Sequence, residues 1–302
     1  MKRFMIGQYG SFDSRKYERD FRDDFFGIEA CLFAAEEDTA KLVLESRRRD
    51  FCVGVHFPFR AGMSKLRDAL VLSPDNRIRA EAYGLIEREL EFLRAVQPLY
   101  ILFHYPKPVI LDERVDWSGW RFADPAEYIS ESSITIDELR AGTEHLLQWL
   151  SEKGKAYRFI PVLEFDALSR YIYDTDMLEE LLQRYRSVRL CLDTGRMFLQ
   201  EKLDPYFDAG RVIHKYAKYA YLVHLSNLQY KDGIVLHHHP VLPDQQTEDG
   251  WAPIEAYLQA ILEESPDVKI MFEHRSDRIT EDQLSQCYSW VERIFNESCN
   301  RP

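Results

Sequence analysis

The stretch RFIPVLEFDALSRYIYDTDMLEELLQRYRSVRLCLDTG, residues 158–195, holds two apolar runs on either side of a helical pattern. The runs RFIPVLEF and VRLCLDT are short and do not alternate with polar residues, which is typical of parallel strands buried on both faces. Between them, TDMLEELLQRY repeats its apolar residues at helical spacing. Because a helical crossover brings the next strand back parallel to the first, this stretch predicts a β-α-β unit.

Further apolar runs extend this pattern along the chain. They cover residues 3–7, 27–33, 51–57, 99–105, 221–226 and 268–274. Eight strands alternating with helices over 302 residues predict a single (β/α)8 TIM barrel domain that spans residues 1–302. A doubly wound open sheet is the alternative, but no G-x-G-x-x-G motif follows the first run.

Helical patterns occupy several of the segments between these runs. They lie at residues 76–97, 135–154, 175–185, 252–264 and 280–295. Two of them begin with a capping box, in which a threonine is followed three residues later by Glu138 or Gln283. The glycine at position 154 is predicted to end the helix that starts near Thr135.

The composition is that of an acidic protein with a sizeable core. Hydrophobic residues make up 45% of the chain and the formal net charge is -12. No apolar stretch reaches the ~18 residues that a membrane span needs. The start MKRFMIGQYGSF lacks the apolar segment of a secretory signal, so we expect a cytoplasmic protein. The negative charge makes nucleic acid an improbable partner without excluding a local basic groove. Five cysteines without paired spacing predict buried free thiols.

Polar side chains end most of the predicted strands. They are Glu29, His56, His104, Glu164, Asp193, His224 and Glu273. Any one of them, taken alone, is explained by a hydrogen bond in the core or by a helix cap. The carboxyl ends of barrel strands carry the active site of such enzymes, and seven metal-capable residues there predict a metal centre.

The last four of these residues are predicted to surround one ion. Glu164, Asp193, His224 and Glu273 follow one another on consecutive predicted strands. Carboxylate and imidazole ligands without a thiolate suit Mn²⁺, Zn²⁺, Mg²⁺, Co²⁺ or Fe²⁺. Such a shell leaves positions open for substrate oxygens, which the ion can polarise.

The order Glu, Asp, His, Glu in the motifs LEFD, CLDTG, VHLSN and MFEH resembles the xylose isomerase-like barrel superfamily. This superfamily includes sugar isomerases and epimerases, together with endonuclease IV. The resemblance implies a divalent-metal-dependent isomerase or epimerase of a small sugar, sugar acid or sugar phosphate. It assigns Glu164 and Glu273 a double role, as metal ligands and as the acid and base that form and reprotonate a metal-held enediolate.

The chain departs from the family pattern at two positions. Arg196 stands where the family usually has a substrate-binding histidine, and Tyr230 stands where it often has an arginine. These departures argue against a neutral ketohexose. Arg196, Lys107 and Arg275 instead suit a carboxylate or phosphate on the substrate, although each, taken alone, is explained as a surface charge.

The histidine-rich segment HLSNLQYKDGIVLHHHP, residues 224–240, favours a rival reading. Endonuclease IV and the ultraviolet-damage endonucleases bind several ions through histidines at strands three and four and in a long loop after strand seven. His56 and His104 match the first two places, and His237 and His239 follow His224 by thirteen and fifteen residues. Arg196 opposes a further ion, so a multimetal phosphodiesterase is the second hypothesis. A non-catalytic ligand-binding barrel is the third.

In the preferred reading the remaining polar residues contact a small-molecule substrate. We expect His56, His104, His237 and His239 to take this role. Residues 117–128, WSGWRFADPAEY, form an insertion that suits a lid, a homo-oligomer contact or local packing.

Overall fold

The computed structural model describes residues 1–299 and contains a closed barrel of parallel strands in the order β1-β12-β9-β8-β7-β4-β3-β2. These strands are β1 (Phe4–Tyr9), β2 (Gly27–Cys31), β3 (Cys52–His56), β4 (Tyr100–Tyr105), β7 (Ile160–Phe165), β8 (Arg189–Asp193), β9 (Ala220–Leu225) and β12 (Lys269–Phe272). All eight predicted runs form these strands, with ends that differ by two residues at most. The predicted (β/α)8 barrel is therefore confirmed.

Helices follow the barrel strands along the chain. They are α1 (Ser14–Asp20), α2 (Glu36–Arg49), α3 (Asn76–Leu93), α4 (Ile136–Tyr157), α5 (Arg170–Tyr173), α6 (Met177–Arg184), α7 (Thr194–Leu203), α8 (Ala209–Tyr216), α9 (Ile254–Glu264) and α10 (Glu281–Cys299). Short strands outside the barrel are β5 (Val109–Leu111), β6 (Tyr128–Ser130), β10 (Asn227–Tyr230) and β11 (Ile234–His239). The sequence predicted α3, α4, α6, α9 and α10 and missed the other helices.

Helix α4 confirms one sequence prediction and corrects another. Thr135 and Glu138 form the predicted capping box, each side chain accepting from the other residue's backbone N–H. The helix does not end at Gly154 but continues to Tyr157, and the next residue, Arg158, takes a φ of 62°. A Cβ at position 154 would lie 2.8 Å from Pro161 Cγ, so the glycine serves the close packing of α4 on β7 instead.

The chain divides into two compact units. One contains Met1–Gly7, Asp13–Phe26 and the chain from Leu190 onward, and the other contains Gln8–Phe12 and Gly27–Arg189. Because the barrel strands are shared between the units, the predicted single domain over residues 1–302 stays a prediction.

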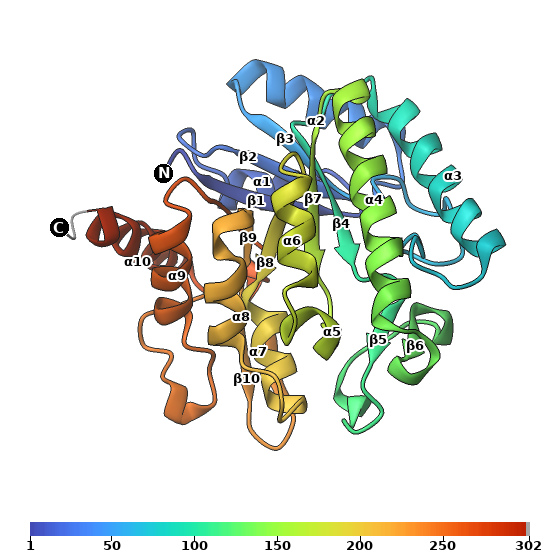
Figure 1. The fold of residues 1–302 in the computed structure, drawn as a ribbon. Coiled ribbons are helices and arrows are strands. Elements are labelled where there is room, and N and C mark those ends of the chain that lie inside the picture. The colour runs from blue at the N-terminus through green and yellow to red at the C-terminus, as the bar shows by residue number, and fades with distance from the viewer. Residues whose placement is uncertain (300–302) are drawn as a thin grey trace. The chain divides into compact units, whose positions relative to one another are not determined.

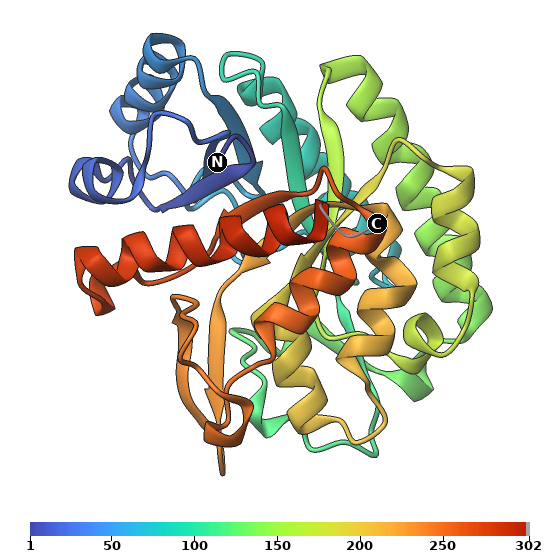
Figure 2. The same ribbon diagram turned by 90° about the vertical axis from the view of Figure 1, so that its left-hand side faces the viewer.

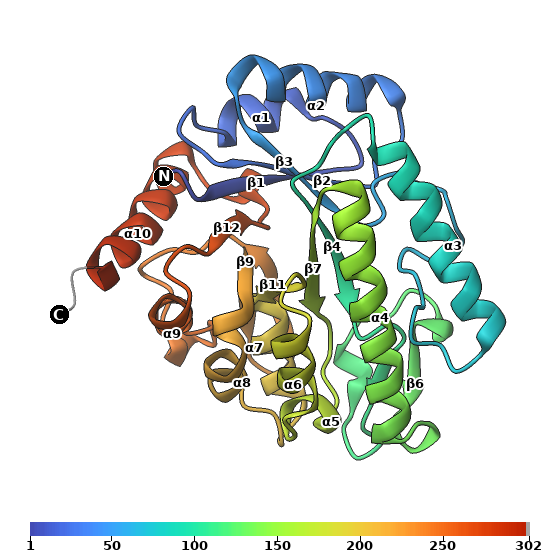
Figure 3. The ribbon, with the colours of Figure 1, turned by 45° about the horizontal axis from the view of Figure 1, so that its top comes forward.

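The unit that contains Gly27–Arg189 carries strands β2, β3, β4 and β7. Helices α3 and α4 lie side by side (Figures 1 and 3), and the ring of Tyr83 meets that of Trp149 with centroids 4.8 Å apart. The register of β4 and β7 places His104 opposite Glu164. Inside this part of the barrel, the Tyr100 hydroxyl donates to Glu29 Oε2 over 2.7 Å, so the predicted strand-end carboxylate Glu29 is held by a buried hydrogen bond.

The unit that contains the chain from Leu190 carries β8, β9 and β12, where Asp193 pairs with His224 in the register of β8 and β9. Helix α9 packs on both α8 and α10. The chain leaves β9 into an antiparallel hairpin of β10 and β11, which Figure 2 shows in orange. The histidine-rich segment is thus a hairpin and not an irregular loop.

The predicted insertion at residues 117–128 is tied into a small sheet of its own. Strands β5 and β6 flank it and pair in parallel. Trp120 is buried and its ring meets that of Trp117 edge to face, with centroids 6.1 Å apart. These contacts are local packing, and roles as a lid or an oligomer contact stay predictions.

Two further expectations concern the membrane and the thiols. Across residues 1–299, no helix combines the length and the apolar character needed to span a membrane. The cysteines whose side chains the structure describes form no disulfide, as predicted, and all are buried except Cys52, which is partly exposed. They are Cys31, Cys52, Cys191 and Cys287. The fifth, Cys299, lies outside the described side chains.

Candidate functional site

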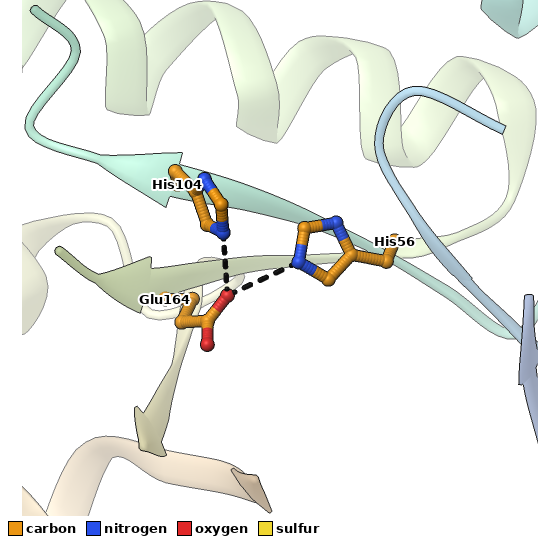
Figure 4. A group of neighbouring side chains, drawn as sticks. All are labelled: His56, His104 and Glu164. Atoms are coloured by element: carbon orange, nitrogen blue, oxygen red, sulfur yellow. Dashed lines mark ion pairs between the residues drawn. The ribbon is translucent and has the colours of Figure 1, made fainter. Parts of the chain in front are cut away.

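Two histidines converge on Glu164 at the carboxyl ends of their strands. His56 Nε2 lies 3.2 Å and His104 Nε2 lies 3.0 Å from the same carboxylate oxygen, Glu164 Oε2 (Figure 4). All three side chains are buried. Their ligand atoms lie within 4.8 Å of one another, so the three residues form a group that could hold a metal ion.

Hydrogen bonds on the far side of each ring set its orientation. His56 Nδ1 donates to the carbonyl oxygen of Phe57 over 3.0 Å, and His104 Nδ1 donates to Asp68 Oδ2 over 2.8 Å. Both rings therefore present Nε2 to Glu164, as histidines do when they bind a metal or hold a catalytic carboxylate. A half-buried cation, Arg67, approaches His56 with Nη2 3.2 Å from Nε2.

Lys107 lies between two buried carboxylates. Its ammonium is 3.0 Å from Asp68 Oδ2 and 2.8 Å from Asp166 Oδ2. Burial lowers the pKa of Lys107, but Asp166 and Asp68 outweigh burial and hold it above its usual value. Burial raises the pKa of Asp68, but His104 and Lys107 outweigh it, and the carboxyl stays ionised far below its usual range. The predicted contact between Lys107 and substrate stays a prediction.

A second ligand group lies in the other unit. One ligand atom from each of Asp193, His224 and Glu273 lies within 4.8 Å of the others. His224 Nδ1 is 3.4 Å from Glu273 Oε2, and the Glu273 side chain is 30% exposed while that of His224 is fully buried. Asp193 also caps α7, because its Oδ1 accepts from the backbone N–H of Arg196 over 3.0 Å.

Arg196 stands beside this second group. Its Nε lies 3.3 Å from Asp193 Oδ2, and the side chain is partly exposed. Arg275 is different, because its guanidinium forms a two-point pair with Asp277 and is 59% exposed. The predicted substrate contacts of both arginines stay predictions, and Arg196 is the one that lies against a predicted metal ligand.

The β10–β11 hairpin brings the histidine run beside Glu273. The backbone N–H of Arg275 donates to the carbonyl of His238 over 2.8 Å, and His238 Nδ1 lies 3.2 Å from the carbonyl oxygen of Glu273. His239 Nδ1 lies 3.0 Å from Gln245 Nε2. The imidazole of His237 lies against that of His238, with ring centroids 5.0 Å apart. The histidine run is therefore half-buried and lies next to Glu273, a predicted metal ligand. The predicted substrate contacts of His237 and His239 stay predictions.

Sequence reasoning missed three charged residues around Glu164. Asp166 stood within the LEFD motif without a role, whereas Arg67 and Asp68 belong to the long segment between β3 and α3. No periodic pattern marks that segment. A charged pair followed by the apolar residues ALVL at 69–72 was the only available signal that the chain re-enters the core there.

The donor atoms of both groups suit a hard or borderline divalent cation. They are carboxylate oxygens and imidazole nitrogens, which Mn²⁺, Zn²⁺, Mg²⁺, Co²⁺ and Fe²⁺ accept. Neither of these two groups contains a cysteine ligand.

Comparison with known proteins gave matches by structure alone. No family model matches the sequence, and no curated protein matches it. A D-tagatose 3-epimerase-like protein is similar in structure, with a TM-score of 0.63 and 14% sequence identity. The match covers 97% of this chain and 99% of that protein. The 3-keto-D-glucoside 4-epimerase YcjR from E. coli matches 97% of this chain with 100% of its own, at 12% identity and a TM-score of 0.59.

A third similar structure is an IolI protein with a bound zinc atom. It matches 98% of this chain with 99% of its own, at 11% identity and a TM-score of 0.60. This chain has the fold of the xylose isomerase-like TIM barrels. At these identities the likeness concerns the fold, and the chemistry has to be argued from the residues of this chain.

Proposed function

We propose that this protein is a divalent-metal-dependent isomerase or epimerase of a small sugar, sugar acid or sugar phosphate. The observation that carries the proposal is the gathering of carboxylate and imidazole ligand atoms, with Asp193, His224 and Glu273 within 4.8 Å of one another. Glu164 lies near the carboxyl end of β7, which neighbours β8 in the barrel order. The similarity in fold to proteins named as sugar epimerases also supports the proposal.

One ion is proposed to be held by Glu164, Asp193, His224 and Glu273. When bound, a divalent ion polarises the carbonyl and the neighbouring hydroxyl of a sugar and so acidifies the C–H bond between them. The four ligands come from strands that are consecutive in the barrel order, β7, β8, β9 and β12.

Glu164 and Glu273 are proposed to move the proton. One carboxylate removes the proton from the carbon next to the carbonyl, and the other returns a proton to the neighbouring position or to the opposite face. His56 and His104 hold Glu164 Oε2 in a fixed place for this transfer. Arg196 is proposed to bind a carboxylate or phosphate of the substrate, and His237 and His239 its hydroxyls.

The proposal is tested by proton exchange. The Mn²⁺-loaded protein is incubated in D2O with ketohexoses, their phosphates and hexuronic acids, and deuterium at the carbon next to the carbonyl is measured by NMR. We expect deuterium incorporation and an isomer or epimer with at least one sugar. The absence of exchange on every member of the set by metal-loaded protein contradicts the proposal.

A multimetal phosphodiesterase is the second candidate, and a specific observation favours it. His56, His104 and Glu164 form a ligand group by themselves, which a one-ion enzyme does not need. Elemental analysis of the purified protein separates the candidates, because the isomerase is expected to bind about one ion per chain and the phosphodiesterase two or three. Metal-dependent nicking of abasic-site DNA decides for the second candidate.

A further inference from the structure

Buried polar contacts run in an unbroken chain from Asp166 to Glu164. Asp166 Oδ2 lies 2.8 Å from Lys107 Nζ, and Lys107 Nζ lies 3.0 Å from Asp68 Oδ2. The same Asp68 oxygen lies 2.8 Å from His104 Nδ1, and His104 Nε2 lies 3.0 Å from Glu164 Oε2. None of these side chains is more than 8% exposed.

Asp68 fixes the orientation of the His104 ring, because its Oδ2 lies 2.8 Å from Nδ1. A carboxylate only accepts, so Nδ1 must donate to it, and the ring is then turned with Nε2 toward Glu164. Lys107 in turn holds Asp68 in place, since its ammonium shares the Asp68 oxygen with His104 and is anchored from the other side by Asp166.

We propose that Asp68 and Lys107 are positioning residues that orient His104, and through it the Glu164 carboxylate, for proton transfer; this role rests on the proposed function of Glu164. Lys107 then acts inside the protein and not as the cation that binds the substrate's carboxylate or phosphate. Recognition of an anionic group falls to a cation nearer the ligand groups, such as Arg196.

A purely structural role is the competing explanation. Buried ion pairs often add little stability over an apolar replacement, because desolvation offsets the attraction between the charges. Stability alone therefore gives little reason for a lysine held by two aspartates at this place. The chain also contains a structural comparison pair in the same unit, in which Arg60 Nε lies 3.0 Å from the buried carboxylate of Glu89.

The first measurement reads the ring of His104 directly and needs no substrate. Histidine ring nitrogens are observed by NMR in protein labelled with 15N-histidine, and the His104 signals are assigned by their loss in His104→Gln. We expect a protonated Nδ1 in the unmodified protein, loss of that proton in Asp68→Ala, and a shifted Nδ1 resonance in Asp68→Asn, where a neutral acceptor replaces the carboxylate. An unchanged His104 signal in Asp68→Asn overturns the inference, even if Asp68→Ala does not fold.

The second measurement follows catalysis on the sugar that exchanges fastest. Asp68→Ala is expected to lower kcat by about 10–100-fold with little change in KM, as loss of an outer partner of a site histidine does. Asp68→Asn should recover part of this loss. Glu89→Gln is the matched control, and it is expected to lower the thermal midpoint while leaving kcat, KM and the His104 signals unchanged. Equal effects of Asp68→Asn and Glu89→Gln on kcat overturn the inference.

The two measurements also separate this inference from the proposed function. If no sugar exchanges deuterium but Asp68→Asn still shifts the His104 resonance, the proposed reaction is wrong and the orientation of His104 by Asp68 stands. If sugars exchange deuterium but the resonance and kcat ignore Asp68, the reaction stands and the positioning role is wrong.

Discussion

Glu164 and Glu273 are proposed to share one task, yet they lie in different surroundings. The Glu164 side chain is 1% exposed and meets two imidazoles, one of which is held by Asp68. The Glu273 side chain is 30% exposed, and its Oε2 lies 3.4 Å from Nδ1 of His224. In the proposed reaction, Glu164 would therefore be oriented before substrate binds, whereas Glu273 would stay in contact with water and exchange its proton with solvent.

The largest effect should come from the oriented carboxylate. Glu164→Gln is expected to lower deuterium exchange by at least about 10²–10⁴-fold, since it removes both a proton carrier and a metal ligand. Circular dichroism and the thermal midpoint should show an intact fold, because the amide fills the same volume. Full activity of Glu164→Gln on any sugar removes the catalytic role of this residue.

Metal binding should depend on the second ligand group, Asp193, His224 and Glu273, more than on the buried histidines His56 and His104. His224→Ala is expected to weaken metal binding by more than the roughly 10–100-fold that loss of an outer partner causes. His56→Ala should leave about one ion per chain. Elemental analysis after dialysis measures both variants. A lower ion count in His56→Ala would show that the buried group of His56, His104 and Glu164 binds an ion, and it would support the multimetal candidate.

Two cations test how much burial matters for the stability that an ion pair contributes. Lys107→Met leaves Asp68 and Asp166 as buried carboxylates without their cation, so we expect a loss of about 3–5 kcal/mol in the free energy of unfolding. Arg275→Met removes a pair that lies in water, and we expect an unchanged free energy of unfolding. Urea denaturation measures both. Equal losses would show that the burial of Lys107 does not matter for stability.

The smallest effect is expected in the histidine hairpin. Replacing His237 and His239 by alanine should raise KM by roughly 2–10-fold for each lost hydrogen bond to substrate, with kcat and the ion count nearly unchanged. Steady-state kinetics and elemental analysis check this expectation. A lower ion count together with lost cleavage of abasic-site DNA would instead make these residues ligands of a multimetal nuclease.

The barrel was readable from the sequence because each strand is buried on both faces. Runs such as VRLCLDT predict a strand and also its polar end. Asp193 could therefore be placed at the carboxyl end of its barrel strand from the sequence alone. Helix α2 could not be read in this way, because among its residues only Leu42 is buried and the rest of the helix is strongly polar.

The inner part of the site was harder to predict for another physical reason. Asp68 reaches His104 from a segment of irregular backbone, and the separation of 36 residues between them carries no periodic signal. The hairpin was missed because the six residues IVLHHH become a strand through pairing with Asn227–Tyr230, a partner that composition does not reveal. Contacts set by tertiary structure therefore marked the limit of what the sequence could give.

The charged chain of Asp166, Lys107 and Asp68 also has an evolutionary consequence. Loss of Lys107 leaves two buried carboxylates without their cation, and loss of either aspartate removes one of the two partners of the buried ammonium, so a lineage that changes them one at a time passes through a less stable intermediate. Homologous barrels should therefore keep the three residues together or have lost all three. In an alignment of relatives, the positions of Asp68, Lys107 and Asp166 should covary as a group, whereas those of Arg275 and Asp277 should drift independently.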